Sequence, residues 1–229
     1  MTNHLLISVH MPKTAGTSCL HLFEEIYGGK LFRDYDDKIL HKSLPIKRKD
    51  ALFSLLKNRL NTSMYSKIDC IHGHFMPIKY RFIFPKRALF LTWLRHPVQR
   101  LISHYYYWMR ETSFSEGETL RRKVIHEKWS LERFCLSEEL RDIYSRFLWG
   151  FPLRRFNFIG ITEFFDEDMR FFSEEMFGTN LKIKPINLNP NRDEKIYTID
   201  DALRKEIENF HKKDMALYEE ALALRLLRL

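Results

Sequence analysis

Cysteine is scarce in this chain of 229 residues. The three cysteines, Cys19, Cys70 and Cys135, are an odd number, are widely spaced and form no CxxC pair. A disulfide framework needs an even set of cysteines, and a zinc ribbon needs them in close pairs. Both kinds of fold are therefore disfavoured.

Long apolar runs are absent as well. The first apolar stretch, Leu5–Val9, is short and follows no basic segment. A membrane-spanning helix needs about 20 apolar residues, and a signal peptide needs a basic start. We therefore expect no signal peptide, no transmembrane helix and a cytoplasmic location. The chain also has no repeat, low-complexity segment or linker, which predicts a single domain over residues 1–229.

Acidic residues are too few to balance the basic ones. Lys and Arg number 38 against 30 Asp and Glu, which leaves a formal charge of +8 at pH 7. This excess favours an anionic partner, but it does not choose among a nucleic acid, an acidic polysaccharide, a phosphorylated cofactor and a membrane surface. Hydrophobic residues make up 45% of the chain. That is enough for a full core, so a disordered protein is excluded.

The most informative segment that is present reads as a strand, a turn and a helix. Leu5–Val9 has the composition of a strand buried on both faces, Pro12 ends it, and helical spacing begins at Cys19. The turn, residues 13–18, is small and rich in hydroxyl groups. A helix that opens after a strand directs free N–H groups and a positive dipole end at the sheet edge, which suits an anion.

Residues 13–18 also carry the side chains of a phosphate site. Lys13 supplies mobile positive charge, and Gly16 lets a ligand approach the backbone. The hydroxyl donors are Thr14, Thr17 and Ser18. An ordinary turn with N-capping residues is the alternative. A Walker A loop is excluded, because no GxxxxGK[ST] is present and the lysine precedes the glycine.

Further strands and helices alternate along the chain. The composition of a buried strand recurs at Ile68–Ile71, Ala88–Leu94 and Phe156–Ile161. Strands separated by helices predict a parallel sheet with right-handed crossovers. We therefore expect an α/β fold, namely a P-loop-like three-layer fold with a central parallel sheet flanked by helices. Helical spacing predicts helices at residues 49–60, 97–108, 119–129, 130–136, 138–149, 166–177 and 200–229, and residues 30–47 and 187–192 are expected to be loops.

Polar motifs follow three of the expected strands, at residues 13–18, 72–74 and 95–103. Ligands of parallel sheets bind at the carboxyl ends of the strands. Arg95 stands at one such end, and Ser103 lies eight residues later, about two turns into the next helix. A guanidinium and a hydroxyl in this arrangement could hold a second phosphate. A solvated, basic helix start is the alternative.

Two of these motifs resemble the nucleotide-binding motifs of sulfotransferases that use 3′-phosphoadenosine 5′-phosphosulfate (PAPS). They are PKTAGTS at residues 12–18 and LRHPVQRLISHY at residues 94–105. The sequence His72-Gly73-His74 is similar to the branch that contains heparan sulfate and uronyl 2-O-sulfotransferases. The family's aspartate after the strand-end arginine is His96 here. The short chain together with this resemblance implies a compact, soluble member of bacterial type.

The resemblance implies transfer of a sulfuryl group from PAPS to a carbohydrate hydroxyl, with adenosine 3′,5′-bisphosphate as product. Lys13 would neutralise the charge on the leaving phosphate, while Arg95 and Ser103 hold the 3′-phosphate. Arg192 could close over the 3′-phosphate or the adenine, and an exposed loop arginine is the alternative. The residues expected around the 5′-phosphate are Lys13, Thr14, Ala15, Gly16, Thr17 and Ser18.

A sugar hydroxyl is a poor nucleophile, so a base is needed that works near pH 7. The family pattern points to His74, with His72 as a supporting residue or alternative base. A structural strand end and a paired-histidine metal site are other readings of these histidines, although the reaction requires no metal.

A basic and aromatic set near the motifs is expected to bind the acceptor, acidic polysaccharides included. This set contains His72, Lys79, Arg81, Tyr105 and Arg110. The alternative is that the aromatic residues belong to the core and the charges are solvated. Two other functions stay open: a P-loop-type nucleotide kinase or NTPase, and a non-catalytic module that binds polyanions. The latter would explain the net charge but not two phosphate motifs at strand ends. We expect no nucleic-acid partner.

Overall fold

A parallel β-sheet forms the centre of the computed structural model, which describes residues 4–37, 43–60, 65–82, 88–111, 119–179 and 196–228. The sheet has five strands in the order β2-β3-β1-β4-β5, and every neighbouring pair is parallel. Its strands are β1 (Leu5–Val9), β2 (Leu31–Asp34), β3 (Cys70–Gly73), β4 (Ala88–Leu94) and β5 (Phe158–Ile161). The predicted fold class, a P-loop-like α/β fold with a parallel sheet between helices, is confirmed.

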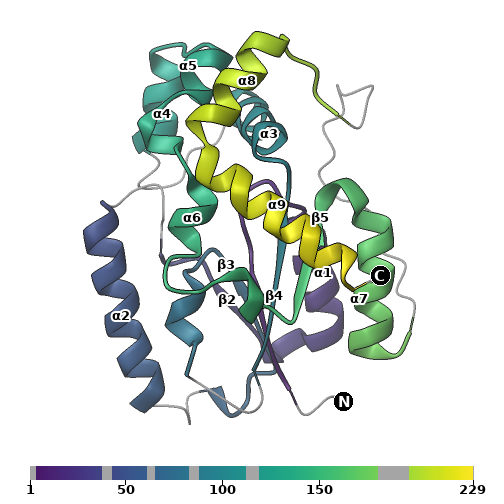
Figure 1. The fold of residues 1–229 in the computed structure, drawn as a ribbon. Helices are drawn as coiled ribbons and strands as arrows, with labels where there is room; N and C mark the ends of the chain where they lie inside the picture. The colour runs from purple at the N-terminus through teal and green to yellow at the C-terminus, as the bar shows by residue number, and fades with distance from the viewer. Residues whose placement is uncertain are drawn as a thin grey trace.

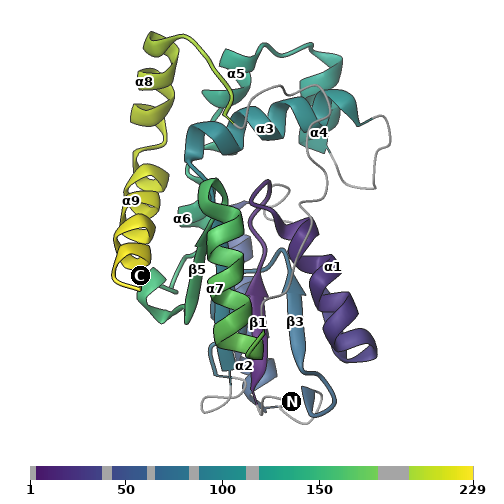
Figure 2. The same cartoon turned by 90° about the vertical axis from the view of Figure 1, so that its right-hand side faces the viewer.

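Helices cover both faces of the sheet (Figures 1 and 2). On one face, α1 and α7 pack on Leu6 and Leu91, and on the other face α6 and α9 pack on Ile7 and Ile71. These inward residues alternate along β1 as the two-residue period of a strand requires. The helices are α1 (Gly16–Tyr27), α2 (Leu44–Leu60), α3 (Pro97–Arg110), α4 (Thr119–His126), α5 (Leu131–Cys135), α6 (Ile143–Phe147), α7 (Phe165–Phe177), α8 (Asp201–Phe210) and α9 (Lys212–Leu226).

A separate helical lobe lies beyond the carboxyl ends of the strands. It consists of α3, α4, α5 and α8, which gather around a second core that includes Val98, Trp108, Phe134 and Ile207. Figures 1 and 2 show this lobe above the sheet, with α3 leading into it directly from β4. The strand ends therefore face the lobe, and this arrangement defines where a ligand can lie.

Three of the predictions about secondary structure are wrong. In place of one helix over residues 138–149, the structure has the 3₁₀ helix Glu138–Leu140 and then α6, separated at Asp142, whose backbone is left-handed. Residues 30–47 were expected to be a loop, but they contain the edge strand β2 and the start of α2. The alternation of β2 is obscured because the strand is only four residues long and partly exposed. Gly73 on β3 lets β2 lie close to it, because a Cβ atom at Gly73 would lie 1.7 Å from the carbonyl oxygen of Asp34 on β2.

The predicted helix over residues 200–229 is divided at His211 into α8 and α9. The buried His211 imidazole makes two hydrogen bonds to the backbone. Its Nδ1 accepts from the Asp142 N–H at 3.2 Å, and its Nε2 donates to the Cys135 carbonyl at 2.7 Å. Burial lowers the pKa of His211 to about 4, in keeping with a neutral ring.

A buried carboxylate fixes the far end of α9. Asp168 on α7 accepts from the Ile161 N–H at 2.7 Å and from Arg225 Nε at 2.8 Å. Since a buried charge is tolerated only when it is paired, this contact ties α9 firmly to β5 and α7.

The cysteines are all buried and free, as expected. Among the described residues, no helix is long and apolar enough to cross a membrane.

Candidate active site

The three polar motifs meet at one edge of the sheet. β1 lies between β3 and β4, and Val9 is in register with Gly73 on one side and with Thr92 on the other. The His10 N–H donates to the Gly73 carbonyl at 2.8 Å, and the Thr92 hydroxyl donates to the Val9 carbonyl at 2.9 Å. The strand ends that carry residues 13–18, 72–74 and 95–103 are therefore adjacent, as predicted.

The loop after β1 has an unusual backbone. Lys13 and Ala15 have φ values of 69° and 64°, in the left-handed region that non-glycine residues rarely adopt. Such residues cost about 1–3 kcal/mol each and cluster at functional sites. α1 begins at Gly16, earlier than predicted, and its N-cap Ala15 makes no side-chain capping hydrogen bond. The start of α1 is therefore suited to an anion.

The hydroxyl groups of this loop differ in their roles. The buried Thr14 hydroxyl donates to the Met11 carbonyl at 2.9 Å, so its hydrogen holds the loop together. Ser18 is buried in the first turn of α1, and Thr17 is half-buried. Thr14 can thus contribute to anion binding through its N–H group rather than its hydroxyl hydrogen, which corrects the expectation for this residue.

Gly16 has a different role from the predicted one. A Cβ atom at Gly16 would lie 1.8 Å from Nε2 of His10, so the imidazole of His10 occupies the space that a side chain would need. The glycine is therefore required for close packing of His10 rather than to open the backbone to a ligand.

Positive charges gather around Lys13. Burial and, to a smaller extent, the nearby cations Arg95 and Arg110 together lower the pKa of Lys13 to about 8. The Lys13 ammonium lies 4.1 Å from the ring centroid of Tyr107. The structure thus brings together Lys13, Arg95 and Arg110, and their mutual repulsion favours a multiply charged anion between them.

A tyrosine from another element holds the turn that carries Arg95. The Tyr144 hydroxyl on α6 donates to the Arg95 carbonyl at 2.7 Å and accepts from the Arg95 N–H at 3.0 Å. Arg95 and Ser103 are both largely buried, and the Arg95 guanidinium lies 5.7 Å from the Tyr197 ring. The backbone at the end of β4 is therefore fixed before any ligand binds.

Behind Tyr144, a carboxylate and a guanidinium are buried together. Asp214 on α9 accepts from the Tyr144 N–H and the Ser145 N–H, each at 3.0 Å. Arg100 is fully buried, 5.5 Å from the Tyr144 ring, and it lowers the pKa of Asp214 against the stronger effect of burial, which raises it to about 6. Neither Tyr144 nor Asp214 was predicted as a site residue.

His96, the residue that departs from the resembled motif, is held by the short 3₁₀ helix that follows β5, Thr162–Phe164. The His96 N–H donates to Glu163 at 2.9 Å, and the Thr162 hydroxyl donates to the Leu94 carbonyl at 2.9 Å. A histidine at this position therefore fits the turn without disturbing Arg95.

Three imidazoles cluster beside the loop. The His10 ring lies 4.3 Å from the His74 ring and 5.2 Å from the His72 ring, measured between centroids. The ring of Tyr35 lies 5.0 Å from that of His74. His72 is buried and its Nδ1 lies 2.8 Å from Ser8 Oγ, whereas His74 is only partly buried. His74 is thus better placed than His72 to meet a ligand.

The environment keeps this histidine cluster neutral. Burial lowers the pKa of His74 to about 4 and that of His72 to about 3, with the charge of His74 adding to the effect on His72. Burial and the neighbouring histidines lower the pKa of His10 well below its ordinary value. All three rings are therefore neutral at pH 7 and can accept a proton, but a pKa of about 4 makes His74 a weaker base than an ordinary imidazole. No group of His, Cys, Asp and Glu side chains among the described residues is arranged to hold a metal ion.

His10 was missed in the sequence, although a signal was present. It directly follows β1, at the same sheet edge as His72 and His74, so strand pairing alone would have brought them together.

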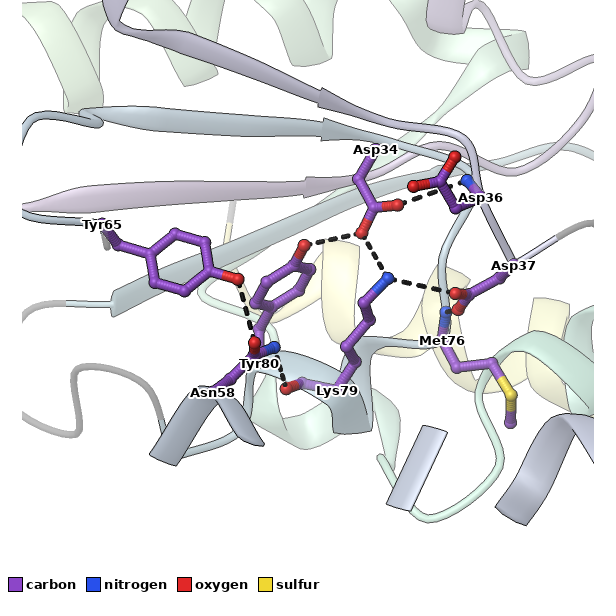
Figure 3. A network of polar contacts seen from close by, with 8 residues as sticks. All are labelled: Asp34, Asp36, Asp37, Asn58, Tyr65, Met76, Lys79 and Tyr80. Carbon is purple, nitrogen blue, oxygen red and sulfur yellow. Dashed lines mark hydrogen bonds and ion pairs between the residues drawn. The ribbon is translucent and has the colours of Figure 1, made fainter. Parts of the chain in front are cut away.

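The predicted acceptor residues are divided among different surroundings. The Lys79 ammonium is paired with Asp34 at 2.7 Å and with Asp37 at 3.1 Å, and the Tyr80 hydroxyl also donates to Asp34 (Figure 3). The Tyr105 hydroxyl donates to the Trp129 carbonyl at 3.1 Å within the lobe. Lys79 and Tyr105 therefore already have hydrogen-bond partners within the protein, and their role in acceptor binding stays a prediction.

The other members of the predicted set lie in three places. His72 is buried in the histidine cluster. Arg81 stacks on the Phe82 ring at 5.0 Å, beside α2. Arg110 is exposed and close to Lys13, so it is the member that the site retains.

Arg192, which was predicted to bind the nucleotide, and the loop predicted over residues 187–192 lie outside the described residues.

The fold is that of a P-loop-like α/β protein. At the carboxyl edge of its sheet, a cluster of cationic side chains lies beside a neutral histidine. No family model matches the sequence. The chain is 25% identical over 150 residues to heparan sulfate 2-O-sulfotransferase 1 of Mus musculus, and the match covers 63% of this chain and 40% of that protein. This similarity supports the assignment of the chain to the sulfotransferases, although the chain spans well under two thirds of the relative.

A solved structure, a sulfotransferase from Alicyclobacillus acidocaldarius, is 16% identical with a TM-score of 0.46 over 96% of both chains.

Replacing Gly16 with alanine should destabilise the protein, because the new methyl group would overlap the His10 imidazole. We expect a loss of about 1–3 kcal/mol in the free energy of unfolding, measured by chemical denaturation. Gly29→Ala is the matched control, since nothing lies within 4 Å of a Cβ atom there. In a His10→Ala background, Gly16→Ala should cost much less, because the overlapping ring is absent. Equal stability of the Gly16 and Gly29 variants would contradict this packing.

Proposed function

We propose that the protein transfers a sulfuryl group from PAPS to a hydroxyl group of a carbohydrate. One observation carries this proposal: the Lys13 loop and the Arg95–Ser103 turn lie at adjacent strand ends, beside the neutral His74. Two anion sites on neighbouring strands suit a nucleotide that carries phosphate at both its 5′ and 3′ positions. The similarity to a sulfotransferase supports the same reading.

The donor fits the residues that are present. The pKa of Lys13 is lowered mainly by burial and further by the charges of Arg95 and Arg110, and a polyanion would relieve the repulsion among these three cations. The first turn of α1 and residues 14–18 would surround the 5′-phosphate, while Arg95 and Ser103 would hold the 3′-phosphate. When bound, PAPS supplies an activated sulfuryl group on a phosphate leaving group.

The side chains of the protein then have separate tasks. Lys13 places positive charge where the leaving phosphate gains negative charge, which stabilises the transition state. His74 accepts the proton of the acceptor hydroxyl on an imidazole nitrogen as that oxygen becomes a nucleophile. His10 and Tyr35 pack against His74 and restrict its orientation, because a base must be held within hydrogen-bonding reach of its proton.

The acceptor is proposed from the relative rather than from a groove. The name of the mouse relative specifies a sulfated polysaccharide, and this chain has a net charge of +8. With Lys79 neutralised by Asp34 and Asp37, Arg110 remains to attract an acidic sugar near the loop. A carbohydrate hydroxyl is therefore the acceptor that we infer.

The direct test is sulfate transfer from PAPS to a panel of neutral and acidic oligosaccharides. Lys13→Ala and His74→Ala should each lower turnover by at least about 100-fold, because each removes a group that acts on the reacting atoms. The control is His126→Ala, which changes an exposed histidine on α4. Circular dichroism should show that every variant is folded. Near-normal turnover of the His74 variant with every acceptor would refute the base assignment.

Binding of the product nucleotide should weaken as the pH rises through 8. The pKa of Lys13 is about 8, so its ammonium is charged below that pH and loses its charge above it. The phosphates are already ionised there, since their second pKa is about 6. Above pH 8, the affinity should fall by up to about tenfold per pH unit, because Lys13 must take up a proton again when the nucleotide binds.

Lys13→Arg keeps its charge at these pH values, and its affinity should vary much less with pH. Calorimetric titration at several pH values measures both proteins. An equal pH dependence for the wild type and the arginine variant would show that another group is responsible.

A further inference from the structure

Helix α2 exposes its apolar side. The exposed fractions are 53% for Ile46, 69% for Phe53, 58% for Leu56 and 86% for Leu60. Their spacings of three, four and seven residues place them in one stripe along the helix. The sequence showed leucines at helical spacing in residues 49–60, a pattern that normally marks a core-facing side. The structure shows the reverse, and Figure 1 places α2 along the outer edge of the molecule.

The orientation of α2 is fixed by polar contacts on its inner side. Lys47, Ala51 and Asn58 are the residues that it buries. Asn58 donates to the Lys79 carbonyl at 3.1 Å and accepts from the Tyr65 hydroxyl at 2.9 Å (Figure 3). Rotating the helix to bury its leucines would break these buried hydrogen bonds, which is costly. The outward stripe is therefore a stable feature of the fold.

Basic side chains border the stripe. Lys57 follows Leu56 on one side, and Arg59 lies on the other side, 5.9 Å from the ring of Phe82. That ring is itself 40% exposed and extends the apolar surface beyond the helix. The Arg81 guanidinium lies 5.0 Å from the centroid of the same ring. Four of the exposed charged residues on α2 are basic, namely Arg48, Lys49, Lys57 and Arg59, and one is acidic, Asp50, so the exposed charge of the helix is mostly positive.

The apolar stripe and the basic residues beside it together indicate which kind of partner α2 binds. A contiguous exposed apolar stripe marks an interaction site, whereas single exposed residues do not. Lys and Arg beside an apolar helix face are typical of helices that lie in the membrane interface, with their charges at the level of the headgroups. A second copy of this chain would instead bring like charges together. We propose that α2 docks the protein on an anionic membrane surface, with Phe53, Leu56 and Leu60 in contact with the acyl region.

Vesicle co-sedimentation of the full chain tests this proposal. Wild-type protein should bind vesicles of phosphatidylcholine and phosphatidylserine, and bind pure phosphatidylcholine vesicles much more weakly. The double variant Phe53→Gln and Leu56→Gln should lose at least about tenfold in affinity for the anionic vesicles, since two apolar contacts are removed. Both residues are exposed, so the variant should keep its fold, which circular dichroism checks.

The control is the double variant Leu226→Gln and Leu227→Gln, which changes leucines that are 69% and 85% exposed at the end of α9. It should bind anionic vesicles as the wild type does. Three results would overturn the proposal: no vesicle binding by the wild type, equal binding to neutral vesicles, or unchanged binding by the α2 variant. Light scattering that shows a dimer in the wild type and a monomer in the α2 variant would instead identify the stripe as an interface between copies.

Discussion

The site depends on the pair of hydrogen bonds between the Tyr144 hydroxyl and the backbone of Arg95. Because one hydroxyl binds both the carbonyl and the N–H of the same residue, the turn after β4 has little freedom. Tyr144 is in turn fixed by Asp214 on α9. Elements far apart in the sequence therefore determine where one guanidinium points, as preorganised binding requires.

Destabilising features are concentrated at the same strand edge. Two non-glycine residues, Lys13 and Ala15, have left-handed backbones, and the Lys13 ammonium is placed near other cations. Neither feature helps the protein to fold, since strain and repulsion both oppose it. Both are compensated elsewhere, by the continuous core on the two faces of the sheet. A bound polyanion would relieve this repulsion and so stabilise the folded protein.

The sequence was sufficient for the parallel sheet and for the meeting of three motifs at its edge, because buried strands have a strong compositional signal. The sequence did not predict β2, because four residues are too few to show the alternation of buried and exposed side chains that marks a strand. It misassigned Gly16, since only the fold shows that His10 fills that space. Lys79 was expected to bind the acceptor, because its partners Asp34 and Asp37 lie more than 40 residues earlier in the chain and could not be recognised from the sequence. Long-range pairing of this kind leaves no local trace.

The central claim is that the two anion sites hold one nucleotide. Calorimetric titration with adenosine 3′,5′-bisphosphate, adenosine 5′-monophosphate, ADP and ATP tests it most directly. We expect the bisphosphate to bind tightly and the 5′-monophosphate to bind weakly. Arg95→Ala should greatly lower the affinity for the bisphosphate and leave the affinity for the 5′-monophosphate unchanged. Two results would contradict the claim: ATP that binds as tightly as the bisphosphate, or an Arg95→Ala variant that loses equal affinity for the bisphosphate and the 5′-monophosphate.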